Sequence, residues 1–115
     1  MIRGIHHIAI IVSSEENIRF YKDLGFQEYF RKERPYDTVV LLKGFGMELE
    51  MFVDPNHPAR QINPESLGVR HLSFQVDDID KVAKEFGCES IRTDWAGMRY
   101  ISITDLDGLS IELHE

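Results

Sequence analysis

The sequence contains very little cysteine, no long apolar run and no cluster of basic residues. Its one cysteine, Cys88, permits no internal disulfide, as is typical of a protein kept in a reducing compartment. No segment approaches the roughly 18 apolar residues of a membrane-spanning helix. The N-terminus also lacks the basic region and apolar stretch of a secretory leader. These absences predict a cytoplasmic protein without a membrane span.

Positive charge is also scarce, with 13 Lys and Arg against 20 Asp and Glu and a net charge of −7. This balance argues against a nucleic acid and against an anionic membrane surface as partners.

Proline is rare, and three of the four prolines fall in one stretch, 54–66, which has little apolar content and predicts a connector. A chain of 115 residues that is 43% hydrophobic has enough material for one modest core, whereas half of it would be marginal alone. We therefore expect a single domain, 1–115, made of repeat 1 (about 4–53), the connector and repeat 2 (about 67–115).

The two repeats are visible in the residues themselves. The segment Gly4-Ile5-His6-His7-Ile8-Ala9-Ile10-Ile11-Val12 aligns with Gly68-Val69-Arg70-His71-Leu72-Ser73-Phe74-Gln75-Val76. Later in each half, a turn glycine is followed four residues on by a glutamate inside an apolar strand, in Gly46-Met47-Glu48-Leu49-Glu50 and Gly108-Leu109-Ser110-Ile111-Glu112. Each half therefore begins with a histidine and ends with a glutamate at matching places.

Apolar periodicity and turn residues predict the same order of elements twice. The first half reads as strand, helix and three strands at Ile5 to Val12, Glu15 to Leu24, Phe26 to Arg31, Thr38 to Leu42 and Met47 to Val53. The second half reads likewise at His71 to Val76, Ile79 to Phe86, Cys88 to Arg92, Arg99 to Thr104 and Leu109 to His114. The predicted fold class is α+β, with two βαβββ repeats whose curved sheets surround a cleft.

Strand parity selects four candidate metal ligands. His7 lies on the other strand face from Ile8, Ile10 and Val12, whereas His6 shares their face. A carboxylate among apolar residues is costly to bury unless a cation neutralises it. Two imidazoles and two carboxylates suit a divalent metal ion, with nickel, cobalt, zinc or manganese favoured and iron less so. The predicted metal ligands are His7, Glu50, His71 and Glu112.

Other candidates have simpler interpretations. A lone histidine in an apolar strand is more often structural than a ligand, but four matched ligands make coincidence a poor explanation. Glu48 corresponds to Ser110 in the second repeat and is interpreted as a solvated or strand-end acid. His57 and His114 are interpreted as surface residues, and Cys88 as a core filler, because the sequence offers no base for it. Trp95, Met98 and Tyr100 would line the cavity or pack the core, and Arg70, Arg92 and Arg99 would face an anionic substrate or solvent.

The chain resembles the glyoxalase/bleomycin-resistance/dioxygenase superfamily, also called vicinal oxygen chelate proteins. The resemblance spans nearly the whole chain and rests on His7-Ile8-Ala9-Ile10, Phe20-Tyr21-Lys22-Asp23-Leu24-Gly25-Phe26, Gly68-Val69-Arg70-His71-Leu72-Ser73-Phe74 and Asp105-Leu106-Asp107-Gly108-Leu109-Ser110-Ile111-Glu112. The four predicted ligands are similar to the glyoxalase I pattern of the small bacterial type. Extradiol dioxygenases of the superfamily use two His and one Glu around iron, and acyl-CoA epimerases tend to have Gln at the position of Glu50.

The resemblance implies a lactoylglutathione lyase-like metalloenzyme that works as a homodimer, with its site in one chain or shared between two. Its substrate would be a small vicinal-oxygen compound, such as a thiol hemithioacetal of methylglyoxal, isomerised by proton transfer through a metal-bound enediolate. Glu112 and Glu50 would be the catalytic carboxylates, with Glu112 the better candidate for the base. Two alternatives stay open: a metal-dependent dioxygenase or epimerase of the same superfamily, and a non-catalytic protein that binds a drug or metabolite.

Two positions depart from the family pattern. Lactoylglutathione lyases often carry arginine four residues after the first metal histidine and asparagine four after the first metal glutamate, and both serve glutathione. Here these positions are Ile11 and Asp54. An apolar group and a negative charge are poor at holding a peptide carboxylate. Glutathione is therefore in doubt as the thiol of the substrate, and its identity stays open.

Overall fold

A computed structural model describes residues 1–115, which form two compact units, Met1–Ala59 (unit 1) and Arg60–Glu115 (unit 2). The element order in unit 1 is β1 (Ile8–Val12), α1 (Glu15–Leu24), β2 (Gln27–Glu33), β3 (Thr38–Gly44) and β4 (Met47–Val53). Unit 2 contains β5 (His71–Gln75), α2 (Ile79–Glu85), β6 (Arg92–Thr93), β7 (Arg99–Thr104) and β8 (Ser110–His114). The predicted α+β class with two βαβββ repeats is confirmed.

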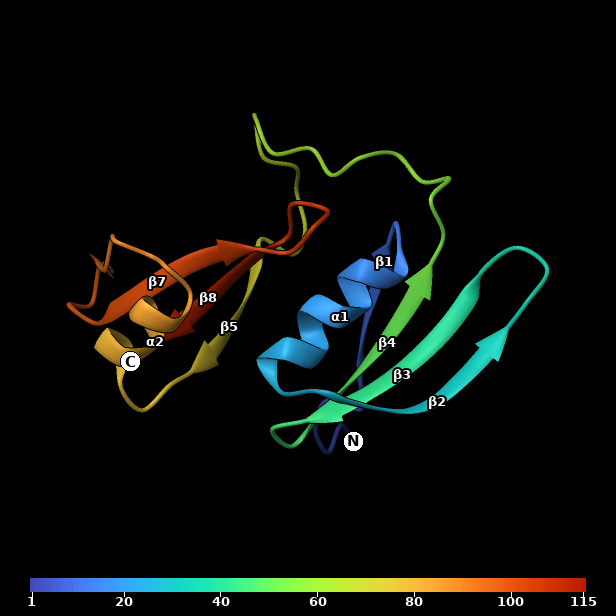
Figure 1. The fold of residues 1–115 in the computed structure, drawn as a ribbon, viewed down its shortest axis with the longest axis horizontal. Coiled ribbons are helices and arrows are strands. Elements are labelled where there is room, and N and C mark those ends of the chain that lie inside the picture. Colours follow the sequence, from blue (N-terminus) through green and yellow to red (C-terminus); the bar gives the residue numbers. More distant parts are fainter. The chain divides into compact units, whose positions relative to one another are not determined.

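Each unit is a four-stranded sheet with one helix against one face (Figure 1). The strand orders are β1-β4-β3-β2 and β5-β8-β7-β6, so the first strand of each unit pairs in parallel with the last strand. The other neighbours within each sheet are antiparallel. This topology brings the histidine strand beside the glutamate strand in both units.

Alternating side chains explain why one face of each sheet is covered and the other is open. In unit 1 the helix side carries fully buried apolar residues from α1 and the sheet, namely Ile18, Tyr21, Val40, Leu42, Leu49 and Met51. In unit 2 the same role falls to Ile79, Ala83, Ile101, Ile111 and Leu113. Burying each large side chain contributes about 1.5–3 kcal/mol, which orients the sheet. Residues of opposite parity are thereby directed to the open face.

Both helices begin and end close to the predicted residues. Ser14 precedes α1, Glu15 and Glu16 occupy its first turn, and Gly25 ends it with φ 123°, a conformation that favours glycine. The side chain of Asp78 caps α2 by accepting a hydrogen bond from the Lys81 amide. Neither helix is long and apolar enough to cross a membrane.

Two predicted strands differ from the structure. The first strand starts at Ile8 instead of Ile5, because it pairs with β4 only from Leu49 onward. The strand expected over 88–92 is reduced to β6, at Arg92–Thr93. Here the Cys88 amide donates to the Ala83 carbonyl at 2.8 Å, so that the chain after α2 closes the helix end instead of entering the sheet.

Candidate metal centre

The first predicted pair of ligands lies on the open face of unit 1. Glu50 is opposite Ala9 in the parallel β1–β4 register, and His7 lies two residues before Ala9, just ahead of the strand. His7 Nε2 is 3.0 Å from Glu50 Oε2, with the side chains 39% and 28% exposed. The two groups are therefore in contact and accessible.

The second pair has the same construction in unit 2. Glu112 is opposite Ser73 in the β5–β8 register, and His71 again lies two residues earlier. His71 Nε2 is 3.4 Å from Glu112 Oε2, with the side chains 28% and 17% exposed. The internal repeat thus extends to the backbone register and to the contact between the side chains.

The local sequence explains why each glutamate faces outward. Gly46 and Gly108 have φ of 74° and 90°, so each turn uses the freedom of glycine to reverse the chain into the last strand. Beyond the turn, the residues on either side of each glutamate are directed into the core, Leu49 and Met51 beside Glu50. The glutamates are therefore held on the open face by the burial of their neighbours.

Each unit brings together two of the four predicted ligands. Neither unit by itself contains a group of three or more His, Cys, Asp or Glu side chains suited to a metal ion. The four-ligand metal centre therefore stays a prediction, and what each unit supplies is one imidazole nitrogen and one carboxylate.

The two histidines have different neighbours. His6 Nδ1 is 2.9 Å from His7 Nδ1, with the two rings edge to face. A hydrogen bond to one ring nitrogen fixes the tautomer and leaves the other nitrogen free for a metal. At the place of His6, unit 2 has Arg70, which pairs with Glu65 at 2.8 Å instead of contacting His71. Only unit 1 therefore has a second imidazole that orients its candidate ligand.

A tyrosine that the sequence did not single out also lies on the open face of unit 1. The β2–β3 register shifts between Glu28 and Phe30, so Tyr29 lies at a bulge. Its hydroxyl donates to Glu48 Oε2 at 2.9 Å, and this bond raises the pKa of the Tyr29 hydroxyl. Glu48, predicted to be a solvated acid, therefore has a specific partner. The bulge, which sequence periodicity does not reveal, is what directs Tyr29 there.

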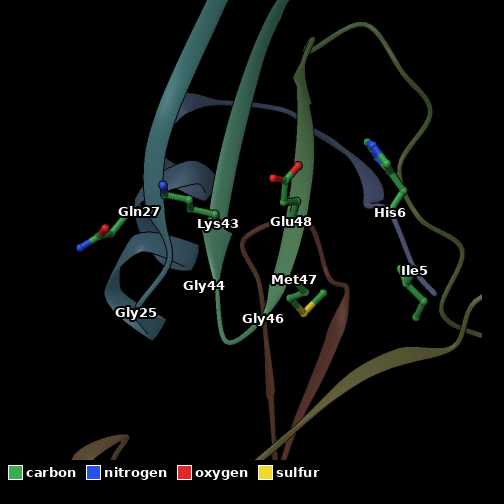
Figure 2. Close-up of a pocket in the computed structure, with 9 residues that line it drawn as sticks. All are labelled: Ile5, His6, Gly25, Gln27, Lys43, Gly44, Gly46, Met47 and Glu48. Carbon is green, nitrogen blue, oxygen red and sulfur yellow. The ribbon is translucent and has the colours of Figure 1, made fainter. Parts of the chain in front are cut away.

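A hollow of about 660 Å³ lies beside this group, at the glycine-rich end of the sheet. Figure 2 shows Glu48 on β4 between Lys43 on the adjacent strand β3 and His6 on the segment before β1. Gly44, Gly46 and Met47 line the hollow at the β3–β4 turn. The hollow reaches His6 but not the pair His7 and Glu50.

A second hollow, of about 190 Å³, lies within unit 2 and includes its His–Glu pair. It is lined by His71, Glu112, Tyr100, Ser102, Ser110, Gly108 and Arg92 from the sheet side and by Arg60, Gln61, Ile62, Glu65 and Arg70 from the segment before β5. Part of this lining comes from the predicted connector, which therefore also contributes to the open face.

The remaining histidines and the cysteine behave differently from one another. His57 Nε2 contacts Asp54 Oδ2 at 3.3 Å in an exposed turn, as expected of a surface residue. His114 was predicted to be a surface residue near a fraying end, but it lies within β8, 3.0 Å from Asp94 and stacked on the Tyr100 ring. Cys88 is half-buried, with Sγ 3.6 Å from the Ser90 carbonyl oxygen. The strand pairing of β8 explains why His114 is held in place.

Of the other residues expected near the cavity, some line the unit 2 hollow and others lie away from it. Trp95 is 98% exposed and Met98 is exposed, so neither packs the core; both lie around a turn that Asp94 closes through its contacts with the Ala96 and Met98 amides. Arg99 pairs with Asp80 and Glu115, away from the hollow. Among the three arginines considered, Arg92 lines the hollow without a hydrogen bond or ion pair of its own.

Comparisons with known proteins agree with this architecture. The family model of the Glyoxalase/Bleomycin resistance protein/Dioxygenase superfamily matches residues 4–113. The chain is 40% identical to the uncharacterized protein YwkD of Bacillus subtilis (strain 168), with 100% of this chain and 98% of that protein covered. It is 37% identical to the uncharacterized protein YaeR of Escherichia coli (strain K12), with 99% and 97% covered.

A solved structure agrees as well. The glyoxalase family protein from Enterococcus faecalis matches with a TM-score of 0.89 and 36% identity over 98% of each chain. The family model covers nearly all of the chain, and the relatives match it from end to end. The chain therefore belongs to the Glyoxalase/Bleomycin resistance protein/Dioxygenase superfamily.

Proposed function

We propose that this chain is a metal-dependent, glyoxalase-like lyase or isomerase acting on a small substrate with two neighbouring oxygens. The observation that carries the proposal is the matched His–Glu contact of each unit, 3.0 Å in one and 3.4 Å in the other, at the same strand register. The two pairs together would supply four ligands to one divalent ion. We expect a homodimer, and the two pairs at one ion would come either from one chain or from both chains of the dimer.

The donor set fits such an ion. Each pair already directs an imidazole nitrogen and a carboxylate oxygen toward one another on an accessible face, as groups that share a cation do. Two carboxylates balance the charge of a divalent metal, and the N/O donors suit nickel, cobalt, zinc or manganese, whereas iron belongs to the dioxygenase alternative. His6 would orient His7 through their Nδ1 contact.

The proposed chemistry is a proton transfer between adjacent carbons. When bound, the metal supplies positive charge beside the two substrate oxygens and so lowers the cost of removing the carbon-bound proton. Glu112 is less exposed than Glu50, at 17% against 28%, and is better shielded from competing water. Glu112 would therefore take the proton from one carbon and return it to the next, with Glu50 assisting, so that no net proton is consumed.

The thiol part of the substrate would not be bound as in glutathione enzymes, because Ile11 and Asp54 lack the groups that hold glutathione there. Ile11 is 52% exposed on the His7 face of β1, where it offers no hydrogen bond. Asp54 is engaged by the Asn56 amide at 2.9 Å and by His57. Neither residue would attract a peptide carboxylate. A different thiol adduct of methylglyoxal is the substrate we favour.

Elemental analysis of the purified protein, followed by a methylglyoxal assay with several thiols, tests this function. We expect a stoichiometric divalent metal and turnover with at least one thiol adduct. Oxygen consumption would indicate a dioxygenase instead, and exchange at a substrate stereocentre would indicate an epimerase. Protein without stoichiometric metal would favour a binding protein that performs no chemistry.

A further inference from the structure

The smaller hollow contains more than the His–Glu pair. Opposite His71 and Glu112 it is bounded by Arg92 on β6 and Arg60 on the segment before β5. Tyr100, Ser102 and Ser110, each with a hydroxyl group, also line it, and the two serine Oγ atoms are 3.2 Å apart. The hollow therefore combines guanidinium groups with hydroxyl donors next to a candidate metal ligand pair.

The charges in this hollow do not cancel. Arg70 is neutralised by Glu65, with contacts of 2.8 and 3.1 Å. Arg60 Nη2 donates to the carbonyls of Val69 and Arg70 at 2.7 and 3.2 Å, which holds the side chain in place, and Glu65 interacts with it electrostatically. Arg92 has no hydrogen bond or ion pair. The lining thus carries three guanidinium groups against the two carboxylates of Glu65 and Glu112, although acids outnumber bases in the chain.

The hydroxyl groups are not a requirement of the fold, since unit 1 has Leu41 and Val39 at the register positions of Ser102 and Tyr100, and Lys32 at the position of Arg92. Ser102 lies opposite Glu112, whereas Leu41 lies opposite Glu50. Tyr100 lies between Arg92 and His114 across the sheet, whereas Val39 lies between Lys32 and Phe52. Both faces carry a basic residue at this position, but a guanidinium beside hydroxyl donors occurs only in unit 2, which points to ligand recognition rather than a structural need.

We propose that this hollow is an oxyanion subsite, in which Arg92 and Arg60 bind a carboxylate or phosphonate group of the substrate. This inference rests on the proposed function, because it places the anionic group beside the oxygens that face His71 and Glu112. A guanidinium offers two parallel N–H donors to an oxyanion, and the Tyr100 and Ser102 hydroxyls add further donors. The substrate class is therefore a small vicinal-oxygen compound that carries an anionic group.

Binding of simple probes to the full-length protein tests the subsite without relying on turnover. Acetate and acetamide have nearly the same shape but differ in charge, and methylphosphonate adds a tetrahedral oxyanion. We expect acetate or methylphosphonate, but not acetamide, to shift the amide resonances of β6 and β7 saturably. The stronger of the two anions identifies the group that the substrate carries.

Two substitutions make the test specific. Arg92→Gln should weaken anion binding roughly tenfold or more, and Arg92→Lys should restore part of it, because a single ammonium keeps the charge but loses the paired donors. Lys32→Gln, at the equivalent register position of unit 1, is the matched control and should change nothing. Equal binding of acetate and acetamide, or unchanged binding in Arg92→Gln, would overturn the subsite.

Metal content separates this result from the proposed function. Arg92→Gln should keep the metal content of the unaltered protein, because Arg92 is not among the predicted ligands. If the unaltered protein holds no metal yet binds anions through Arg92, the subsite stands and the metal-dependent function fails. If metal is bound but the anions are not, the opposite conclusion holds.

Discussion

The two units share one scaffold and one His–Glu contact, yet the surfaces around the contacts differ. In unit 1, Glu50 is flanked across the sheet by Ala9 and Leu41. In unit 2, Glu112 is flanked by Ser73 and Ser102. Both units keep the His–Glu contact, and they differ in the environment of each pair. In the proposed function, the two pairs share one task, metal binding, and recognition of the substrate falls mainly to unit 2.

The orienting groups differ as well. Unit 1 gives His7 a second imidazole, and its bulge adds the hydrogen bond between Tyr29 and Glu48. Unit 2 instead has Arg92, without an ion pair, in the lining of its hollow. The repeat therefore keeps the His–Glu pair while the neighbours of the pair differ, which permits experiments that change one unit and use the other as the control.

The largest expected effect comes from removing either glutamate of the pairs. We expect Glu50→Ala and Glu112→Ala each to lower kcat/KM by about 10²-fold or more, because both carboxylates are required for the metal and the proton transfer. Glu48→Gln, on the same face of β4 as Glu50, is the matched control and should keep most of the activity. Full activity in either alanine variant would remove that residue from the mechanism.

The equivalent core positions should respond alike. Leu49 and Ile111 are fully buried beside Glu50 and Glu112, respectively. We predict that Leu49→Ala and Ile111→Ala each lower the free energy of unfolding by about 2–5 kcal/mol, measured by urea denaturation. A truncation with no effect on stability would show that the helix-covered face is not the core of that unit.

A smaller effect, on metal affinity, should distinguish His6 from Arg70, the residues that precede His7 and His71. We expect His6→Ala to weaken metal affinity by about 10- to 100-fold, because His7 loses the group that fixes its ring. Arg70→Ala, at the equivalent place in unit 2, should leave metal affinity nearly unchanged. Competition with a chromophoric chelator measures both, and equal losses in the two variants would contradict the assignment of His6.

The smallest effect concerns the ion pairs that link α1 to β2. Hydrogen bonds from Arg31 and Lys22 lower the pKa of the Glu28 carboxyl to about 2 from 4.5. Because the folded-state pKa is depressed, this stabilisation is present above pH 4.5 and disappears as the pH falls toward 2. Glu28→Gln should therefore reduce stability at pH 7 by about 1 kcal/mol or less, since the pair is partly exposed, and the difference should vanish near pH 2 in thermal unfolding.

Residue patterns were sufficient to predict most of the fold and the four metal candidates. The internal repeat aligns His7 with His71 and Glu50 with Glu112, and alternation of buried residues places each glutamate on the open face. Pairing within each sheet then explains the contacts within each unit. The combination of all four residues at one metal ion stays a prediction.

Features that depend on distant partners could not be read from the sequence. Tyr29 reaches Glu48 because of a bulge, and periodicity alone gives no sign of an extra residue in a strand. Arg70, Arg92 and Arg99 look alike in sequence, yet only the structure shows that Arg92 lacks an acidic partner. His114 lies within β8 and contacts Asp94, which is 20 residues earlier in the chain, and neither fact is visible in the sequence pattern.

The central claim is that the two His–Glu pairs serve one metal ion, and the number of metal ions per chain tests it most directly. Elemental analysis should give one divalent ion per chain in the unaltered protein. His7→Ala and His71→Ala should each remove nearly all of it, and the double variant should lose no more. Two ions per chain, with each single variant keeping one of them, would contradict the claim and show two independent sites.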